Sequence, residues 1–333
     1  MSDKIDFVII WVDGNDPKWQ EEKNKYSPNN KDSDTRNIRY RDWDNLQYWF
    51  RGVEKFAPWV NNIYFVTWGH IPTWLNINHP KLQIVKHKDF IPEKYLPTFS
   101  SHPIENNLHR IEGLEEKFVY FNDDMFLIKP TKKTDFFKND KPCDSAFLNA
   151  NISYRENNTF VESVNMSVIN DYFIKNEVIR SNFTKWFNLK YGLGIIRTIC
   201  LLPWKAFPGI HNSHLPTSFI KSTYKELWEK EYDILDETCS HKFRYALDVN
   251  QWLFKNWQMV KGDFCPRTPN IGKSFALDDD KEYNNMVYDV IRKQKYKMVC
   301  VNDMVNEDDF ETCRDDLKRA FNDILPEKSG FEL

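Results

Sequence analysis

Short apolar runs that end at polar residues recur along the chain. Residues 5–12 form a run that is apolar except for Asp6 and that stops at Asp13. A run of this length next to turn residues predicts a buried strand. The same pattern predicts further strands at 63–67, 82–85, 117–121 and 298–301, of which the second is the weakest.

Helical periodicity separates these runs. Residues 43–56 carry apolar side chains three and four positions apart, and Pro58 ends the pattern. Ser100 and Pro103 predict the start of another helix, because serine caps a helix and proline fits its first turn. Three more helices are expected at 216–232, 241–259 and 309–325.

Strands that alternate with helices predict an α/β fold with a mostly parallel sheet flanked by helices. The carboxyl edge of such a sheet carries the functional site. The alternation weakens between residues 132 and 209, where Asn-rich turns precede aromatic and basic side chains. We therefore expect a first part of the core at 1–131, an inserted helical lobe at 132–209, and the rest of the core with a C-terminal helix at 210–333.

Composition narrows the class of protein. Aromatic residues make up 16% of the 333 residues, which excludes disorder for most of the chain. The balance of 46 basic and 49 acidic residues does not predict binding to nucleic acid. The six cysteines are scattered without a CxxC pair, and the first apolar run is too short for a signal peptide. These features predict a cytoplasmic enzyme with reduced thiols.

Acidic and amide side chains follow two of the predicted strands. Asn122, Asp123 and Asp124 come directly after one, and Asn302 and Asp303 follow another. Adjacent carboxylates at a strand end can hold a hard divalent cation, which in turn binds a diphosphate. The alternative is a turn with solvated acids.

The first strand ends in a polar corner. Asp13, Gly14, Asn15 and Asp16 occupy the position that meets the nucleoside in many nucleotide-dependent α/β enzymes. The corner has neither a Walker loop nor a GxGxxG motif, so a simple polar turn is the alternative.

Arginines gather before and within the predicted helix at 43–56. Arg36, Arg39 and Arg41 precede the helix, and Arg51 lies within it. Guanidinium groups close to a site rich in aspartate suggest a phosphate grip. Single solvated arginines are the alternative.

Two histidines lie on or beside predicted helices. Glu105 and His109 are four residues apart and share one helix face, which on its own is typical of an exposed polar surface. His214 precedes the helix expected at 216–232, where a neutral imidazole is favoured and can act as a base. The alternative for His214 is a capping or surface histidine.

A third polar group is expected on the helix at 241–259. His241, Arg244 and Asp248 are spaced to share one face of that helix. Asp248 could orient Arg244, which could then grip a phosphate with two hydrogen bonds. A surface salt bridge of little energetic value is the alternative.

Taken together, long blocks of the chain resemble the conserved regions of the Stealth family. The first two regions are similar to IDFVIIWVDGNDPKW at 5–19, RDWDNLQYWFRGVEKFAPWVNNIYFVT at 41–67 and LPTFSSHPIENNLHRIEGLEEKFVYFNDDMFL at 96–127. The third resembles 214–253, and the fourth resembles 297–332. The likeness weakens only between 132 and 209.

The resemblance implies a glycosyltransferase-A-like fold and the reaction of bacterial capsular polysaccharide phosphotransferases. Such an enzyme moves a hexose or N-acetylhexosamine 1-phosphate from a nucleotide sugar, for example UDP-N-acetylglucosamine, to a hydroxyl of an oligo- or polysaccharide acceptor. It forms a phosphodiester, releases a nucleoside monophosphate and uses Mg²⁺ or Mn²⁺. The resemblance also places Glu105, Asp124, His214 and Arg244 in catalytic motifs.

These assignments define the expected site. His214 is the expected base, with Asp124 as its rival, while Arg244 stabilises phosphate charge and Glu105 supports the site or binds the acceptor. The expected metal ligands are Asp123, Asp124, Asn302 and Asp303. The expected contacts to the nucleotide sugar are Asp13, Gly14, Asn15, Asp16, Arg39, Arg41, Arg51, Asn122 and His109.

Other functions fit parts of the pattern. A metal-dependent glycosyltransferase would release a nucleoside diphosphate instead, and a non-catalytic carbohydrate-binding protein would use the 12 tryptophans for stacking on sugars. Residues 186–204 mix lysine, arginine, tryptophan and leucine, which suits peripheral contact with the inner face of the cytoplasmic membrane. The alternatives are the edge of a domain core and an acceptor groove. The identity of the sugar, the acceptor hydroxyl and the oligomeric state stay open.

Overall fold

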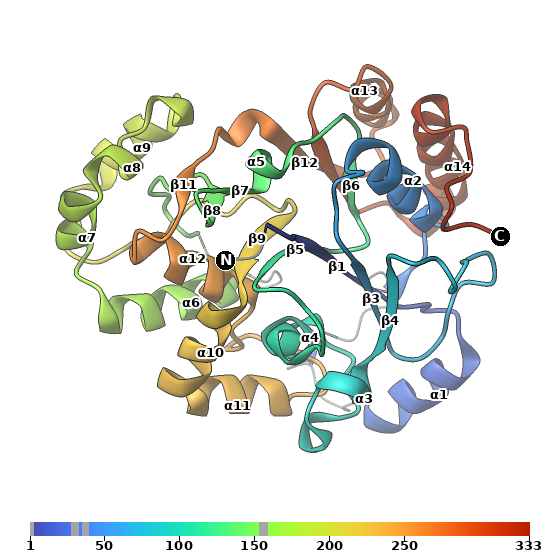
Figure 1. Cartoon of the computed structure of the whole chain (residues 1–333), viewed down its shortest axis with the longest axis horizontal. Helices are drawn as coiled ribbons and strands as arrows, with labels where there is room; N and C mark the ends of the chain where they lie inside the picture. The colour runs from blue at the N-terminus through green and yellow to red at the C-terminus, as the bar shows by residue number, and fades with distance from the viewer. Residues whose placement is uncertain (1–2, 28–32, 35–39, 153–158) are drawn as a thin grey trace.

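The computed structural model describes residues 3–27, 33–34, 40–152 and 159–333. Its central sheet has the strand order β4-β3-β1-β5-β9 and crosses the middle of the molecule (Figure 1). The strands are β1 (Asp6–Trp11), β3 (Ile63–Thr67), β4 (Leu82–Lys86), β5 (Lys117–Phe121) and β9 (Thr217–Ile220). All are parallel except β9, which runs antiparallel to β5. The expected α/β fold with a mostly parallel sheet is confirmed.

Side chains of β1 alternate between two hydrophobic clusters. Phe7 and Ile9 belong to one cluster, whereas Val8 belongs to the other. Successive residues of a strand point to opposite faces, so both faces of the sheet are buried. This explains why the strands are continuous apolar runs rather than alternating ones.

A second layer covers the Phe7 face. It contains α2 (Leu46–Phe56), α13 (Lys281–Arg292) and α14 (Glu307–Ile324), at the upper right of Figure 1. It also contains a small sheet of β12 (Gly272–Leu277), β13 (Met298–Asp303) and β6 (Met125–Leu127). The strand expected at 298–301 and the helix expected at 309–325 are confirmed, each with slightly different bounds.

Helices also cover the Val8 face. The rings of Tyr224 and Phe254 stack there with centroids 3.8 Å apart. Among the helices that contribute to this cluster are α4 (Ser101–Asn107), α6 (Thr159–Tyr172), α7 (Lys175–Ser181), α10 (Lys221–Lys230), α11 (Tyr232–Ser240) and α12 (Gln251–Val260). The predicted start of α4 is confirmed, because the Ser100 side chain accepts a hydrogen bond from the amide of His102.

The helix predicted at 216–232 is wrong at its start. Residues 217–220 form β9, and only α10 that follows is helical. The side chains of Thr217 and Phe219 are buried, and their backbone pairs with β5. Sheet pairing therefore overrides the apolar spacing that favoured a helix.

The helix predicted at 241–259 is also wrong over its first half. Residues 244–245 form the short strand β10 (Arg244–Tyr245), which pairs with β2 (Ser33–Asp34), and α12 begins at Gln251. Asn250 caps α12, and the Asp248 carboxylate accepts a hydrogen bond from the amide of Tyr245. Such side-chain bonds to the backbone compete with helix formation.

The expected lobe is helical in its second part. Helices α8 (Phe183–Trp186) and α9 (Gly194–Leu201) lie at the left edge of the molecule (Figure 1). The first part instead carries β8 (Lys141–Asp144), which pairs with β7 (Phe137–Lys138) and with β11 (Cys265–Pro266). The domain bounds at 131 and 209 stay predictions.

The remaining elements are short. They are α1 (Pro17–Tyr26), α3 (His87–Phe90), α5 (Lys133–Phe136) and the 3-10 turns Glu93–Tyr95, Leu108–Arg110, Leu189–Tyr191 and Pro269–Ile271. The six cysteines form no disulfides in this structure. In the described residues, no helix has both the length and the apolar character needed to cross a bilayer.

Candidate active site at the carboxyl edge

Sheet pairing brings the polar strand ends together. Tyr120 of β5 lies opposite Thr217 of β9 in an antiparallel register. The residues that follow β5 therefore meet the residues that precede β9, and β1 ends at the same edge because it is parallel to β5. This places Asn122 beside His214.

Hydrogen bonds form a continuous line that ends at His214. The amide nitrogen of Asn122 lies 3.0 Å from Nε2 of His214. The hydroxyl of Tyr120 contacts the amide oxygen of Asn122, and it lies 3.1 Å from a carboxylate oxygen of Glu105. The backbone amide of Gln251 donates to the other oxygen of Glu105. Glu105 is thus linked to His214 through two intervening side chains.

Three possible metal-binding groups converge at this edge. Ligand atoms of Asp124, His214 and Cys300 all lie within 4.8 Å of one another. The Oδ1 atom of Asp124 is buried and has no hydrogen-bond partner in the part of the chain that the structure describes. Burial raises the pKa of the Cys300 thiol well above its usual value, and the charge of Asp124 adds to this rise, so the thiol stays neutral.

Further carboxylates lie near this group. Solvent reaches the Asp123 side chain, yet protein surrounds it closely enough that desolvation raises its pKa to about 7. The charges of Asp124 and Asp42 add to this rise, while Arg244 opposes it. Burial also raises the pKa of Asp42, with a smaller contribution from Asp13. Neighbouring carboxylates among these four residues repel each other, and a bound cation or a proton would relieve that repulsion.

These residues fit the cation that the family resemblance implies. Carboxylate oxygens suit Mg²⁺ and Mn²⁺. The unpartnered oxygen of Asp124 is the clearest sign of such a site, because a buried carboxylate oxygen is normally hydrogen-bonded. A neutral Cys300 thiol is a poor ligand for either ion.

Asn302 and Asp303 are not part of this group, which corrects their assignment as ligands. The Asp303 carboxylate accepts hydrogen bonds of 2.8 and 2.7 Å from the guanidinium of Arg41 and one of 3.1 Å from the indole of Trp43. The amide of Asn302 donates to the hydroxyl of Ser274 at 2.9 Å. Both side chains are occupied by protein partners.

Two of the arginines expected to bind phosphate form ion pairs with carboxylates of the C-terminal part of the chain instead. Besides its bonds to Asp303, Arg41 lies 3.9 Å over the ring of Phe310. Arg51 binds the Glu332 carboxylate through two hydrogen bonds of 2.8 and 2.7 Å. Neither guanidinium is free for a ligand in this arrangement, and Arg39 lies outside the described residues.

The residues of the corner after β1 have two kinds of role. Asp13 lies near Asp42 and the acidic group, while Gly14 and Asp16 support the local fold. The amide of Asp13 donates to Nε2 of His70 at 2.8 Å, and the amide of Asn15 donates to the Asp13 carboxylate. Asp16 caps α1 by accepting from two backbone amides, so its expected role at the nucleotide gives way to a helix cap. A Cβ at Gly14 would lie 1.9 Å from the backbone oxygen of Tyr40, and only glycine fits this approach.

Arg244 reaches the site without the help of Asp248. Its guanidinium donates to the Ser101 hydroxyl at 2.9 Å, and its charge acts on Asp123. The Asp248 carboxylate instead contacts Nδ1 of His102 at 2.9 Å and Nδ1 of His241 at 2.7 Å. The expected pairing of Asp248 with Arg244 on one helix face is therefore wrong.

His109 does not join the cluster either. Its ring lies among the rings of Tyr224 and Trp228, and burial lowers its pKa to about 3. The helix ends at Asn107 and continues as a 3-10 turn, so Glu105 and His109 no longer share a face. His109 is a core residue rather than a contact for a nucleotide sugar.

Sequence reasoning missed four residues of the site. Tyr120 precedes Asn122 by two positions, so strand alternation could have placed both side chains on one face. Cys300 stands in the same relation to Asn302. No local signal pointed to Asp42 or to His70, because only the tertiary fold brings them near Asp13.

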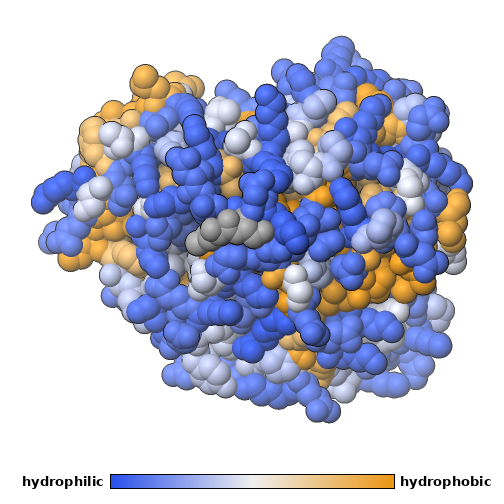
Figure 2. Space-filling model, viewed as in Figure 1, coloured by the Kyte–Doolittle hydropathy of each residue, from blue (hydrophilic) through white to orange (hydrophobic). Residues whose placement is uncertain are grey.

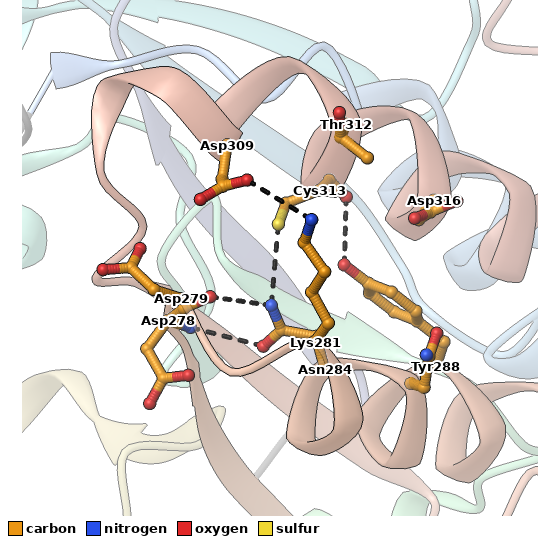
Figure 3. A pocket seen from close by; sticks show the side chains of 10 residues that line it. Asp278, Asp279, Lys281, Asn284, Tyr288, Asp309, Thr312, Cys313 and Asp316 are labelled. Atoms are coloured by element: carbon orange, nitrogen blue, oxygen red, sulfur yellow. Dashed lines mark hydrogen bonds and ion pairs between the residues drawn. The ribbon is translucent and has the colours of Figure 1, made fainter.

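A separate recess between α13 and α14 is lined by acids (Figure 3). Its polar groups satisfy one another: the Asn284 amide donates to the backbone oxygen of Asp278, and Lys281 lies 3.8 Å from Asp309. The Tyr288 hydroxyl donates to the backbone oxygen of Cys313. This recess shares no residue with the cluster around Asp124. Its ion pair and the hydrogen bond from Tyr288 join two packed helices.

Comparison with known families gives two matches. Residues 3–31 match the family model described as Stealth protein CR1, conserved region 1. Residues 39–144 match Stealth protein CR2, conserved region 2. The two matched segments contain Asp13, Asn122 and Asp124.

Relatives cover the whole chain. The capsular polysaccharide phosphotransferase WcwK of Streptococcus pneumoniae is 43% identical over 332 residues, which is 99% of this chain and 98% of the relative. The receptor polysaccharide phosphotransferase WefC of Streptococcus oralis is 41% identical over 99% of both chains. The exopolysaccharide phosphotransferase cps2G of Lactiplantibacillus plantarum is 40% identical over 98% of this chain and 96% of its own.

Solved structures are more distant. A crystal structure of the galactosyltransferase LgtC with donor and acceptor sugar analogues aligns with a TM-score of 0.42 and 10% identity, covering 97% of this chain and 96% of the other. Mouse xyloside xylosyltransferase 1 aligns with a TM-score of 0.34 and 10% identity, covering 89% of this chain and 97% of its own.

Proposed function

This chain belongs to the Stealth family of polysaccharide phosphotransferases, and from that premise we propose that it transfers a sugar-1-phosphate from a nucleotide sugar to a sugar hydroxyl. The product is a phosphodiester within a capsular or other cell-surface polysaccharide, and a nucleoside monophosphate leaves. The single observation that carries this proposal is the convergence of Asp124 and His214 at the carboxyl edge, with Arg244 near Asp123.

The electrophile in this reaction is phosphorus. The acceptor hydroxyl attacks the phosphate that bears the sugar, in line with the departing nucleoside monophosphate. The bond between the anomeric carbon and its oxygen stays intact, so the anomeric configuration of the donor is retained. The protein must therefore position two substrates, neutralise diphosphate charge and accept one proton.

His214 is the residue that we assign to accept this proton. The Tyr120 hydroxyl has one proton, and burial raises the pKa of Tyr120 so far that it stays a phenol. If a carboxylate at Glu105 takes this hydrogen bond, the Asn122 amide turns its NH₂ toward Tyr120 and its oxygen toward His214. Nε2 of His214 then carries a proton, and the lone pair of Nδ1 is available to the acceptor hydroxyl.

Charge at the diphosphate is balanced by two sets of groups. Asp124 and Asp123 would hold Mg²⁺ or Mn²⁺, which supplies positive charge to the phosphate oxygens when bound. Arg244 lies close enough to Asp123 that its positive charge lowers the pKa of that carboxyl group. Its guanidinium, held by Ser101, is placed to bind a phosphate oxygen.

Product analysis tests the reaction type. The purified chain is incubated with a panel of nucleotide sugars, short oligosaccharide acceptors and Mg²⁺, and the products are followed by ³¹P NMR. A new phosphodiester signal together with nucleoside monophosphate supports the proposal. Release of nucleoside diphosphate with no phosphorus in the saccharide would establish the glycosyltransferase alternative instead.

The second alternative, a carbohydrate-binding protein without catalysis, is wrong, because the family consists of enzymes of polysaccharide phosphotransfer. The nucleotide-sugar panel remains the informative measurement, since it identifies the donor. A matched reaction with the His214→Ala variant controls for spontaneous hydrolysis and for contaminating activities.

A further inference from the structure

Helix α9 packs against the protein with its small residues. Gly194 and Thr198 are buried, and they lie four positions apart on one face. A Cβ at Gly194 would lie 2.7 Å from the ring of Phe147, and the Thr198 hydroxyl accepts a hydrogen bond from the amide of Leu148. The inward face of α9 is therefore a close contact with the backbone around residue 148.

The large apolar residues of α9 and of the turn before it point the other way. Leu189 is 90% exposed and Leu193 is 78% exposed, while Ile196 and Ile199 are each more than half exposed. A surface helix normally buries its large apolar side chains and exposes its polar ones. Helix α9 has the reverse arrangement.

Neighbouring side chains extend this exposed surface. Phe183 of α8 is 58% exposed and Trp204, just after α9, is 56% exposed. Figure 2 shows apolar surface gathered at the upper left, where Figure 1 places α8 and α9. We call the side chains of Phe183, Leu189, Leu193, Ile196, Ile199 and Trp204 the lobe surface. An apolar patch of this kind on a protein marks a surface that binds a partner.

The segment that carries the lobe surface has charges of one sign. Residues 178–205 contain five lysines and arginines and no aspartate or glutamate, although the whole chain has more acidic than basic residues. Arg180, Arg197 and Lys205 lie in sequence between or beside the exposed apolar residues. A basic, apolar surface is complementary to a surface that is anionic and apolar at once.

We propose that the lobe surface docks on an anionic lipid bilayer. Leucine, isoleucine, phenylalanine and tryptophan side chains enter the interface between headgroups and acyl chains, and the surrounding lysines and arginines bind the phosphate headgroups. The eight residues of α9 are too short to span a bilayer, so the contact is peripheral. A carbohydrate groove would not need isolated aliphatic side chains at this exposure.

The docking residues differ from those that the sequence indicated. Trp186 is fully buried, with its ring 5.8 Å from that of Phe207, so it belongs to the core of the lobe. Trp204, by contrast, is exposed and belongs to the lobe surface. A substitution at Trp186 would therefore damage folding and would not report on a membrane contact.

Packed rings connect the lobe to the segment that precedes β9 and carries His214. The ring of His211 stacks on Phe147 with centroids 4.3 Å apart, and the same Phe147 ring supports Gly194 of α9. His211 precedes His214 by three residues. Docking of the lobe would hold the carboxyl edge of the sheet in a fixed orientation near the lipid surface.

Vesicle flotation with the full chain tests this proposal. The protein is mixed with vesicles of phosphatidylcholine alone or of phosphatidylcholine with phosphatidylglycerol. We expect at least tenfold more protein on the anionic vesicles, and we expect high salt to reduce this binding. The Leu193→Glu/Ile196→Glu variant should lose at least tenfold in bound protein, because both side chains are exposed and the fold does not depend on them.

A matched variant controls for surface charge alone. Ile77 is 51% exposed and Met286 is 41% exposed, and neither belongs to the lobe surface, so Ile77→Glu/Met286→Glu should bind vesicles like the unmodified chain. Equal loss in both variants, or no flotation of the unmodified chain, would overturn the proposal. So would light scattering that shows a dimer which only the Leu193→Glu/Ile196→Glu variant dissociates, since the surface would then bind a second copy. Flotation does not depend on turnover, so its failure leaves the proposed reaction intact.

Discussion

The side-chain amide of Asn122 lies 3.0 Å from Nε2 of His214, although 92 positions separate the two residues in sequence. Asn122 follows a parallel strand, and His214 precedes the antiparallel strand at the edge of the sheet. The contact therefore depends on the one antiparallel pairing in the central sheet. This contact also links the hydrogen bonds from Glu105 and Tyr120 to the group that contains Asp124.

Replacement of His214 by alanine should lower turnover by about 10²–10⁴-fold, which is the usual effect of losing a general base. His214 is partly exposed, so the variant should keep its melting temperature within a few degrees. Initial rates of nucleoside monophosphate release measure the effect. Near-normal turnover in a folded variant would assign the base to another group, such as Asp124.

Tyr120→Phe should disturb the line between Glu105 and Asn122. Loss of the hydroxyl leaves a buried Glu105 oxygen without its side-chain partner, which costs about 1–3 kcal/mol of unfolding free energy. The pH profile of kcat should shift, because Asn122 no longer has a fixed orientation toward His214. Urea unfolding and the pH profile are the two measurements.

Tyr224→Phe is the matched control for this prediction. Tyr224 is also fully buried, but its hydroxyl has no hydrogen-bond partner in the described part of the structure. Removal of that hydroxyl should leave stability equal or slightly higher. If the two variants lose stability and activity to the same extent, the line from Glu105 to His214 has no special role.

Asp124→Asn should weaken binding of Mn²⁺ by at least about tenfold and reduce turnover with it. The substitution keeps the shape of the side chain but removes the charge that a divalent cation needs. Electron paramagnetic resonance of free Mn²⁺ gives the affinity without an activity assay. Unchanged affinity would exclude Asp124 as a ligand.

Asp303→Asn should behave in the opposite way. Asp303 and Arg41 keep side-chain exposures of only 12% and 13%, so loss of this pair should cost on the order of 2 kcal/mol, between the values for exposed and fully buried pairs. Binding of Mn²⁺ should be unaffected, because the carboxylate is already occupied by protein donors. Weaker Mn²⁺ binding in this variant would restore Asp303 to the metal site.

The pair of Asp248 and His241 should make stability depend on pH in two directions. Burial opposes ionisation of Asp248, but hydrogen bonds from His102 and His241 outweigh it and hold its pKa below the usual 3.8. This contribution is present above pH 3.8 and is lost as pH falls through the lowered pKa. The hydrogen bond to Asp248 raises the pKa of His241 above 6.5, so its contribution is complete below pH 6.5 and is lost as pH rises through the raised pKa.

Asp248→Asn removes both contributions. The variant should lose about 3 kcal/mol, and the loss should be largest between pH 3.8 and 6.5, where both groups of the unmodified chain are charged. Urea unfolding of the two proteins at a series of pH values measures this difference. A difference that stays constant across the whole range would mean that the pair does not titrate as described.

The strands, and the polar residues at the strand ends that define the candidate site, were predictable from the sequence because their signals are local. The apolar runs before Asp13 and Asn122 are long enough to identify buried strands, and parallel strands end at one edge. The helix start at Ser100 was equally local. By contrast, the segment around Thr217 fits a helix or a strand by its spacing, and pairing with β5 decided the outcome.

The roles of individual side chains needed the tertiary structure. From the sequence, Arg41, Arg51 and Asp303 were expected to be available to a ligand or metal. Their partners come from segments more than 250 positions away, because Arg41 binds Asp303 and Arg51 binds Glu332. No local pattern encodes such pairs.

The sequence by itself determined the α/β class, the family and the gathering of acids at the ends of the strands, because strand and helix periods and conserved blocks are properties of short segments. Only the tertiary structure decided which acidic side chains lie close together and that Asn122 contacts His214. It also decided that the large apolar side chains of α9 face outward. These relations depend on the register and direction of distant strands and on close packing between elements. The order of residues along the chain does not specify either of these by any local pattern.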